Sequence, residues 1–213
     1  MQQSDLVRIK IQKRIETLSF PSLQHVTLYL IHLEGIQAED VEAAKEVLTP
    51  EEIQDCLRYK NVKRQEQALI TQACLRHLIG PGTIKKNRYG KPYLEGSSCH
   101  FNLSHTEGMA LIGISSTPIG VDIEKILQER VLLDTPLMSA SEQSIIKEAS
   151  DPADMFFSYW CAKEALLKAR GTGFQTRSVP SLTSKSGVFY SDQDQIHVFT
   201  KGRFKLAICY EAF

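Results

Sequence analysis

The stretch PIGVDIEKI, Pro118 to Ile126, has the pattern of a β-strand with two carboxylates on one face. Side chains alternate along an extended chain, so the apolar residues share one face while Gly120, Asp122 and Glu124 share the other. Like charges held close together raise each other's pKa unless a cation or a hydrogen-bond donor offsets them. The acidic face therefore either points to water, as one face of an antiparallel strand often does, or lies beside a cation.

The composition is that of an ordinary globular protein. The chain has 213 residues, 42% hydrophobic and 23% charged, which suits one large domain or two small ones. The formal net charge is zero, which does not support a broad nucleic-acid or anionic-membrane surface. Any anion site must therefore be local, and we expect neither nucleic acid nor membrane as a partner.

The chain shows no targeting or metal-thiolate signal. It has no run of about 18 apolar residues, and its N-terminus lacks the apolar stretch of a secretory signal. Its five cysteines are scattered with no C-x-x-C pair, which argues against a zinc site or a redox couple. We therefore expect a cytoplasmic protein with reduced, mostly buried thiols.

Periodicity and capping signals predict the elements of the first half. HVTLYLIHL reads as a strand, and LTPEEIQDCLRY as a helix with Thr49 as N-cap, Pro50 at the first position and Glu52 three residues after the cap. A second helix ends at Gly80, and PGTIKKNRYGKPYL is interpreted as a loop. HFNLSHTEGMALIGIS then predicts two short strands around a turn.

The same order of elements then starts again. IGVDIEKI is a strand, MSASEQSIIKEA a capped helix, and DPADMFFSYWCAKEALLKARG a long helix that ends at Gly171, before three closing strands. Corresponding elements lie about ninety residues apart, which predicts an α+β fold built as a pseudodimer of two similar subdomains with antiparallel sheets and packed helices. The expected division is an N-terminal extension 1–24, which could be a frayed terminus or an added helix, and subdomains 25–117 and 118–213.

The last long helix carries the remaining acid. Glu164 and Lys168 lie four residues apart, which on a solvated helix would be only a surface ion pair. If this helix packs over the strand, Glu164 joins Asp122 and Glu124 in a three-carboxylate cluster of the kind that Mg²⁺ binds. Lys168 would then hold phosphate.

Two other segments offer polar groups: Lys91-Pro92 in YGKPYL, and Ser104-His105 in FNLSHTEG. Taken singly, the first is as well explained by a loop before a strand, and the second by a capped turn.

In the order GKPYL, FNLSHTEG, IGVDIEKI and WCAKEALLKARGTG, the motifs resemble the 4'-phosphopantetheinyl transferases of the surfactin-synthetase-activating (Sfp-like) type. The resemblance covers roughly Tyr89 to Phe174, with weaker support earlier. It implies a monomeric pseudodimer that binds coenzyme A in its cleft. Such an enzyme transfers the 4'-phosphopantetheine arm to a serine of an apo acyl or peptidyl carrier protein and releases adenosine 3',5'-bisphosphate.

The resemblance also implies roles for individual residues. Asp122, Glu124 and Glu164 are similar to the magnesium ligands, and Lys168 to the lysine that meets the diphosphate. Lys91 and Pro92 resemble the residues beside the adenine, and Ser104 and His105 those that contact the coenzyme's phosphates. Glu164 is the expected acceptor of the serine proton, directly or through a metal-bound water.

The chain also departs from the family pattern. Glu52, Asp55 and Gln67 stand where basic residues that grip the 3'-phosphate are expected. The alternative candidates for this grip are Arg58, Lys60, Lys63 and Arg64, and the grip stays largely unassigned. We expect the carrier on the second half, steered by basic groups after Gly171 that include Arg177 and Lys185. The alternatives are a magnesium-dependent phosphoesterase or nuclease, and a non-catalytic coenzyme A-binding module. The sequence does not say whether the carrier serves fatty acid, polyketide or nonribosomal peptide synthesis.

Overall fold

The computed structural model describes residues 3–20, 25–135, 137–172, 179–191 and 194–210. The helices are α1 (Gln3–Gln12), α2 (Ala38–Val47), α3 (Pro50–Leu57), α4 (Val62–Ile79), the 3₁₀ helix η1 (Gln128–Arg130), α5 (Ala140–Glu148) and α6 (Pro152–Arg170). The strands are β1 (Ile15–Leu18), β2 (Val26–His32), β3 (Ile84–Lys86), β4 (Pro92–Leu94), β5 (His100–Thr106), β6 (Met109–Ser115), β7 (Ile119–Lys125), β8 (Thr183–Lys185), β9 (Val188–Ser191), β10 (Asp194–Lys201) and β11 (Phe204–Tyr210). None of these helices is long and apolar enough to cross a membrane.

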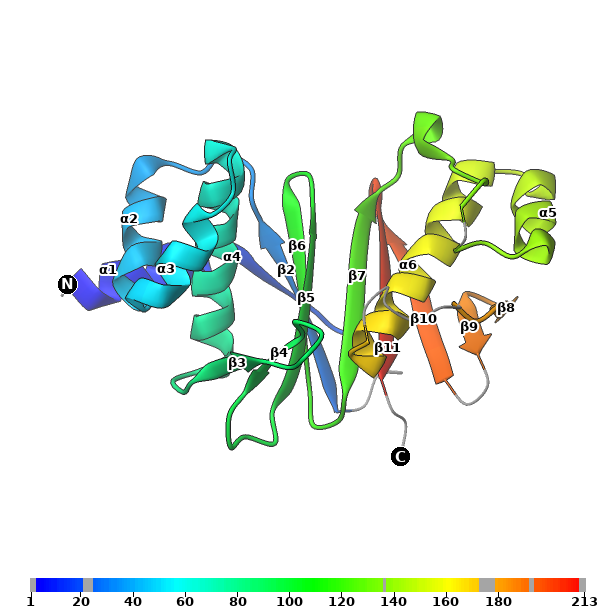
Figure 1. The fold of residues 1–213 in the computed structure, drawn as a ribbon. Helices are drawn as coiled ribbons and strands as arrows, with labels where there is room; N and C mark the ends of the chain where they lie inside the picture. Colours follow the sequence, from blue (N-terminus) through cyan, green and yellow to red (C-terminus); the bar gives the residue numbers. More distant parts are fainter. Residues whose placement is uncertain (1–2, 21–24, 136, 173–178, 192–193, 211–213) are drawn as a thin grey trace.

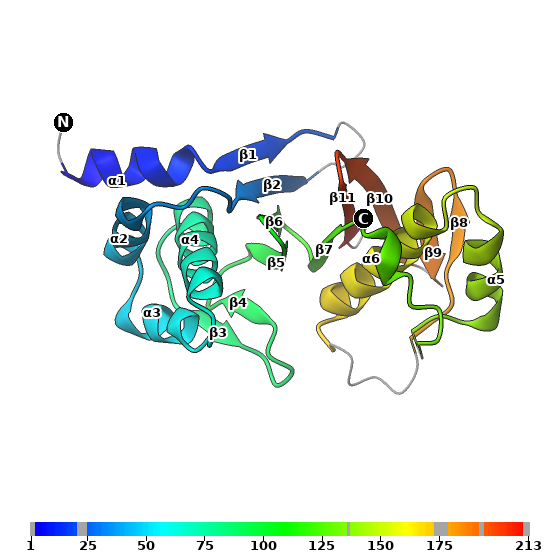
Figure 2. The same ribbon diagram turned by 90° about the horizontal axis from the view of Figure 1, so that it is seen from above.

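Two antiparallel sheets form the centre of the molecule (Figure 1). The first has the strand order β1-β2-β6-β5 and the second the order β7-β11-β10-β9-β8, while β3 and β4 form a separate hairpin. Figure 2 shows α1 to α4 on the side of the first sheet and α5 and α6 on the side of the second. Between the sheets lies an apolar core, to which β2 contributes Leu28 and Leu30, and β7 contributes Val121 and Ile123. The mixed α/β class with antiparallel sheets is therefore confirmed.

The predicted helix boundaries are confirmed by their caps. Thr49 accepts a hydrogen bond from the backbone N–H of Glu52, and the Glu52 side chain accepts one from the N–H of Thr49. Ser139 caps α5 in the same way. Gly80 ends α4, and Gly171, in the left-handed conformation, ends α6.

Two parts of the first half differ from expectation. The segment predicted as a loop is partly a hairpin in which Ile84 of β3 lies opposite Leu94 of β4; strands of three residues are too short to give a periodicity signal. Helix α2 was not predicted at all. Its N-cap is Gln37, whereas Ser, Thr, Asp and Asn are the residues that mark a helix start in a sequence.

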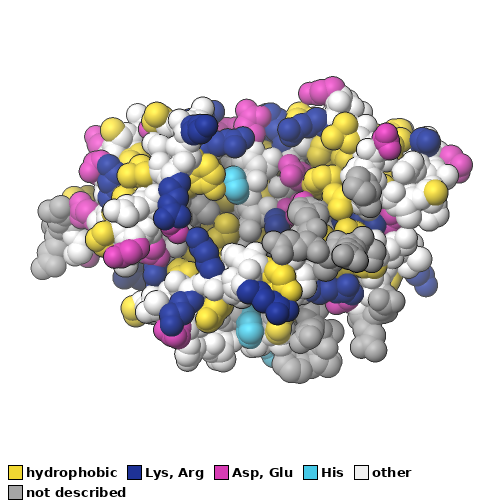
Figure 3. Space-filling view, in the orientation of Figure 1, with side chains coloured by type: hydrophobic (Ala, Val, Ile, Leu, Met, Phe, Trp, Pro, Cys, Tyr) yellow, Lys and Arg dark blue, Asp and Glu magenta, His cyan; other side chains and the backbone are white. Residues whose placement is uncertain are grey.

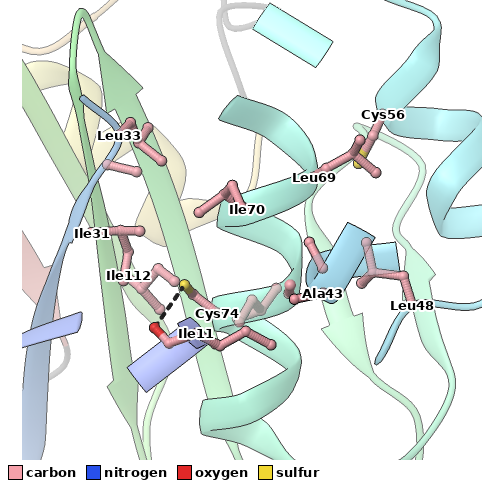
Figure 4. Close-up of a cluster of buried hydrophobic side chains, with 14 of the residues drawn as sticks. Ile11, Ile31, Leu33, Ala43, Leu48, Cys56, Leu69, Ile70, Cys74 and Ile112 are labelled. Carbon is pink, nitrogen blue, oxygen red and sulfur yellow. Dashed lines mark hydrogen bonds between the residues drawn. The ribbon is translucent and has the colours of Figure 1, made fainter. Parts of the chain in front are cut away.

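The N-terminal segment is integrated into the first half. The buried side chains of Val7 and Ile11 on α1 belong to the core formed with α2 and α4. Figure 4 shows the Ile11 carbonyl opposite the Cys74 thiol of α4, which donates to it over 4.0 Å. Strand β1 pairs with β2. The sequence left open whether this segment is a frayed terminus or an added helix. It is not frayed, because its described residues form a packed helix and an edge strand.

Strand β7 is buried on both faces because α6 lies directly on its acidic side. A Cβ atom built on Gly120 would lie 2.0 Å from the carbonyl oxygen of Ala165 and 2.2 Å from the backbone nitrogen of Ala169. Both neighbours are helix backbone and cannot rotate away. Glycine at this position therefore sets how closely α6 approaches the strand.

Gly120→Ala should consequently lower the free energy of unfolding by about 3 kcal/mol, because α6 must move off β7. Gly202→Ala is the matched control, since its Cβ would have nothing within 4 Å and only its positive φ of 57° is unfavourable, at about 1–2 kcal/mol. Urea unfolding of both variants measures the difference. Equal losses would show that the close approach of α6 is not required for stability.

Candidate active site

Asp122 lies at the centre of a small polar cluster between β5, β7 and α6. Its side chain is almost fully buried, with 3% of its surface exposed. Its Oδ1 atom accepts hydrogen bonds from the Ser104 hydroxyl and the Lys168 ammonium group, each over 2.7 Å. Lys168 also donates to the Ser104 oxygen over 2.9 Å. The alternative in which the acidic face of β7 points to water is therefore wrong. The alternative in which Lys168 forms a surface ion pair with Glu164 is also wrong, because Lys168 pairs with Asp122.

The other oxygen of Asp122 meets no hydrogen-bond donor within the described ranges. This oxygen, Oδ2, is buried. A buried carboxylate oxygen without a donor is unfavourable unless a ligand supplies one. The cluster therefore has one strong acceptor site available.

Two further carboxyl groups share this environment. Burial and the negative charge of Asp122 raise the pKa of Glu124 to about 7, although Thr106 donates to its Oε2 atom over 3.2 Å. The same two causes raise the pKa of Glu164 to about 7. Lys168 lowers both values only partly. Three carboxyl groups thus face one ammonium group, and near neutral pH the cluster takes up either protons or a cation.

The structure does not hold these acids in a finished metal site. In the part of the chain described, no three His, Cys, Asp or Glu side chains are arranged as a ready metal-ligand set. The surplus negative charge and the free Asp122 oxygen nevertheless fit a hard divalent cation, which prefers carboxylate oxygens. The predicted ligands Asp122, Glu124 and Glu164 therefore stay a prediction that the local chemistry favours.

Side chains from β5 join the two sheets beside this cluster. Alternate residues of β5 face β7: the Asn102 side chain accepts from the Val121 N–H over 2.9 Å, Ser104 donates to Asp122, and Thr106 donates to Glu124. This spacing of two places all three on one face of the strand.

A cavity of about 790 Å³ opens on the first-half side of β5. Helices α3 and α4, the β3–β4 hairpin and β5 surround it. His105, Leu103 and Pro92 line it, as do Tyr59 and Arg64. Desolvation by the surrounding protein, and the positive charges of Lys168 and Arg64, lower the pKa of His105. The volume is typical of a pocket for a small-molecule ligand or a cofactor.

The structure separates Lys91 from Pro92. Pro92 lines the cavity, and its place beside the adenine stays a prediction. The Lys91 ammonium group instead donates to the backbone carbonyls of Ile119 (3.0 Å) and Ala169 (2.9 Å), and burial lowers its pKa to about 8. In this structure Lys91 therefore ties the β3–β4 hairpin to the start of β7 and the end of α6.

One buried pair was missed by the sequence analysis. Lys163 and Glu142 form an ion pair over 2.9 Å in which each side chain is only 1% exposed. Lys163 also donates to the Pro180 carbonyl, and Glu142 accepts from the Leu182 N–H. This pair fixes α6 to α5 on the side away from Asp122. In the sequence Lys163 stands beside Glu164, and nothing there indicates that its side chain is buried, because lysine and glutamate are usually exposed.

The five cysteines agree with their prediction. All five lie within the described residues and none forms a disulfide bond; Cys99 is partly exposed and the other four are buried. Burial raises the pKa of Cys56 to about 11 and of Cys74 to about 12, which makes these two thiols unreactive. The candidate site is therefore the cluster around Asp122 with the adjoining cavity, and neither Cys56 nor Cys74 belongs to its chemistry.

Comparison with known proteins shows which family the second half of the chain resembles. Residues 118–211 match the family model of the 4'-phosphopantetheinyl transferase superfamily. The chain is 31% identical over 136 residues to 4'-phosphopantetheinyl transferase gsp of Aneurinibacillus migulanus, covering 59% of this chain and 57% of that protein. It is 25% identical over 158 residues to 4'-phosphopantetheinyl transferase Sfp of Bacillus subtilis (strain 168), covering 68% and 70%.

A eukaryotic relative is also similar. The L-aminoadipate-semialdehyde dehydrogenase-phosphopantetheinyl transferase of Schizosaccharomyces pombe is 27% identical over 158 residues, covering 59% of this chain and 60% of that protein. The chain thus spans between 57% and 70% of the length of these three relatives. The match to the family model contains β7 and α6, the two elements that carry the acidic cluster. The part of the chain that carries β7 and α6 is therefore similar to the 4'-phosphopantetheinyl transferase superfamily.

Proposed function

We propose that this protein transfers the 4'-phosphopantetheine arm of coenzyme A to a serine hydroxyl of an apo acyl or peptidyl carrier protein. The observation that carries the proposal is the position of β5 between the two halves of the site. His105 on this strand lines the large cavity, and Ser104 beside it belongs to the cluster with Asp122 and Lys168. A ligand with a nucleotide in the cavity would thus have its diphosphate at the acidic cluster and Lys168.

The reaction requires an acceptor for the proton of the serine hydroxyl and a positive charge that stabilises the leaving group. The serine oxygen forms a bond to the phosphorus next to the pantetheine, the bridging P–O bond breaks, and adenosine 3',5'-bisphosphate leaves. Glu164 takes the serine proton, directly or through a water. The Lys168 ammonium group stabilises the charge that grows on the diphosphate oxygens.

Asp122, Glu124 and Glu164 are the side chains that would hold Mg²⁺. When bound, the ion would supply charge neutralisation for the diphosphate. The proposal is supported by the Asp122 Oδ2 atom without a donor and by the two raised carboxyl pKa values. Ser104 and His105, with Pro92, are proposed to contact coenzyme A, and the role of Lys91 is proposed to be the anchoring of the hairpin beside it.

We also propose that residues 25–117 and 118–213 are two copies of one ancestral unit, with 1–24 as an addition. The order of elements supports this. In each part a strand (β2 or β7) is followed by a capped short helix (α3 or α5), a long helix (α4 or α6) and a hairpin. The second hairpin strand, β6 or β11, then pairs antiparallel with the first strand of its part.

Transfer is tested by incubating the protein with coenzyme A, magnesium and an apo carrier, and weighing the carrier by mass spectrometry. We expect a mass gain of one phosphopantetheine group. Glu164→Gln should lower kcat at least about 100-fold, because the variant lacks the base. Its melting temperature near neutral pH should not fall, since one of three crowded carboxylates is removed.

Two outcomes would contradict this proposal. Hydrolysis of a phosphoester or a nucleic acid without any change of the carrier would point to a magnesium hydrolase. Binding of coenzyme A without turnover would point to a binding module. Near-normal kcat in Glu164→Gln would leave transfer intact and remove the role of Glu164 as base.

A pH experiment tests the metal ligands without an activity assay. In the absence of metal, Glu124 and Glu164 have pKa values of about 7 in the folded protein, against 4.5 ordinarily. Their contribution to stability is therefore complete below about pH 4.5 and is lost as the pH rises through about 7. Mg²⁺ replaces the missing protons, so it should raise the melting temperature more at about pH 8 than at about pH 5.5.

The control is the double variant Glu124→Gln/Glu164→Gln. It should show little stabilisation by Mg²⁺ at either pH, because two of the three proposed ligands are neutral. A magnesium-induced shift of wild-type size in this variant would mean that the ion binds elsewhere.

A further inference from the structure

The connection between α3 and α4 forms an unusual surface, which we call the basic corner and define as residues 57–64. All eight residues are solvent-exposed. Three of them are large apolar side chains with exposed fractions of 44% for Leu57, 41% for Tyr59 and 65% for Val62. Four are cations, and none is an acid: Arg58, Lys60, Lys63 and Arg64.

These cations are largely without partners. Arg58 pairs with Asp55 over 3.0 Å, while in the described part of the chain Lys60, Lys63 and Arg64 form no ion pair. The whole chain has as many acidic as basic residues, 25 of each, so this local excess is not a reflection of its composition. Exposed apolar side chains ringed by one sign of charge mark a surface for a macromolecule of opposite charge. A small anion would need the cations but not Leu57 and Val62.

The basic corner lies on the rim of the proposed active site. Tyr59 and Arg64 line the large cavity. The charge of Lys63 reaches Glu107, whose pKa it helps to lower, and Glu107 pairs over 2.9 Å with Lys125. Lys125 directly follows Glu124 in β7. Figure 3 shows Lys and Arg side chains beside apolar ones at the top of the first half, where Figure 1 places the turn between α3 and α4.

We propose that the basic corner is a docking surface for the carrier protein, which presents carboxylates around an apolar contact. This inference rests on the proposed function, since a partner seated on this rim brings its serine to the entrance of the site. It replaces the expected placement on the second half. Lys185 lies on β8, the edge strand farthest from β7, and Arg177 lies outside the described residues.

The test combines kinetics with a separate binding measurement. Lys60→Glu/Lys63→Glu should raise the KM for an acidic apo carrier protein, and its Kd by fluorescence anisotropy, at least about five-fold at low salt. High salt should shrink the difference, because it screens exposed charges. The KM for coenzyme A should stay unchanged. Lys13→Glu/Lys147→Glu is the matched control, with two exposed lysines reversed elsewhere, and it should leave every constant near the wild-type value.

A second variant tests the apolar part. Leu57→Ser/Val62→Ser should also raise the carrier Kd, and this rise should persist at high salt because it involves no charge. Both side chains are well exposed, so the melting temperature should hardly change.

The outcomes separate the inference from the function on which it rests. An unchanged carrier Kd in both variants would overturn the docking surface. So would a raised KM for coenzyme A with normal carrier binding, which would assign the corner to the coenzyme. A wild-type dimer that Leu57→Ser/Val62→Ser converts to a monomer would assign it to a second copy of the chain. Absence of transfer by the wild type would instead refute the proposed function, and the Kd values would still test the surface.

Discussion

The side-chain seam between β5 and β7 is the constraint on which the rest of the structure depends. The two sheets share no backbone ladder at this line; instead Asn102, Ser104 and Thr106 reach across to β7. Hydrogen bonds of this kind are directional, so they fix the register of one sheet against the other as well as their distance. The apolar core holds the two sheets together, but it does not fix their register to the same degree, because hydrophobic contact is non-directional. The seam therefore decides which residue of the first half faces Asp122.

Helix α6 completes the site from the opposite side, and this arrangement is unfavourable for stability. Gly120 lets the helix backbone touch the strand, which brings Lys168 to hydrogen-bond distance of a buried carboxylate. Among the described residues Lys168 acts on both Glu124 and Glu164 and Arg130 acts on Glu124, yet burial and the charge of Asp122 still raise the pKa of each acid to about 7. A site selected for stability alone would carry fewer acids. Elsewhere on α6, Lys163 and Glu142 form a buried ion pair in which one positive charge meets one negative charge. This pair holds α6 in place, whereas the face of α6 that carries Glu164 has more carboxylates than cations around it.

Much of this could be predicted from the sequence, because the decisive signals are local. Alternation in IGVDIEKI separates the acidic from the apolar face, and the capping residues Thr49, Ser139 and Gly171 mark helix ends within a few residues. What could not be predicted depends on tertiary contacts. Whether the acidic face of β7 meets water or a helix is decided by α6, forty residues later in the chain. The buried state of Lys163 and the turn of Lys91 toward two carbonyls likewise have no local signature, since lysine is normally exposed. Helix α2 was not predicted from the sequence because glutamine is an uncommon N-cap residue.

The two parts of the chain contribute different groups to the candidate site. Strand β2 holds the place in the first sheet that β7 holds in the second, each pairing with the last strand of its hairpin, yet β2 reads VTLYLIH and has no carboxylate. A second acidic strand would bury further like charges with no lysine to offset them. The first half instead supplies the cavity and the hydroxyl donors of β5, and the second half supplies the acids and Lys168. Neither part alone contains both the cavity and the acidic cluster. The proposed transfer therefore requires both parts to stay joined along one strand edge, which is where the side-chain seam lies.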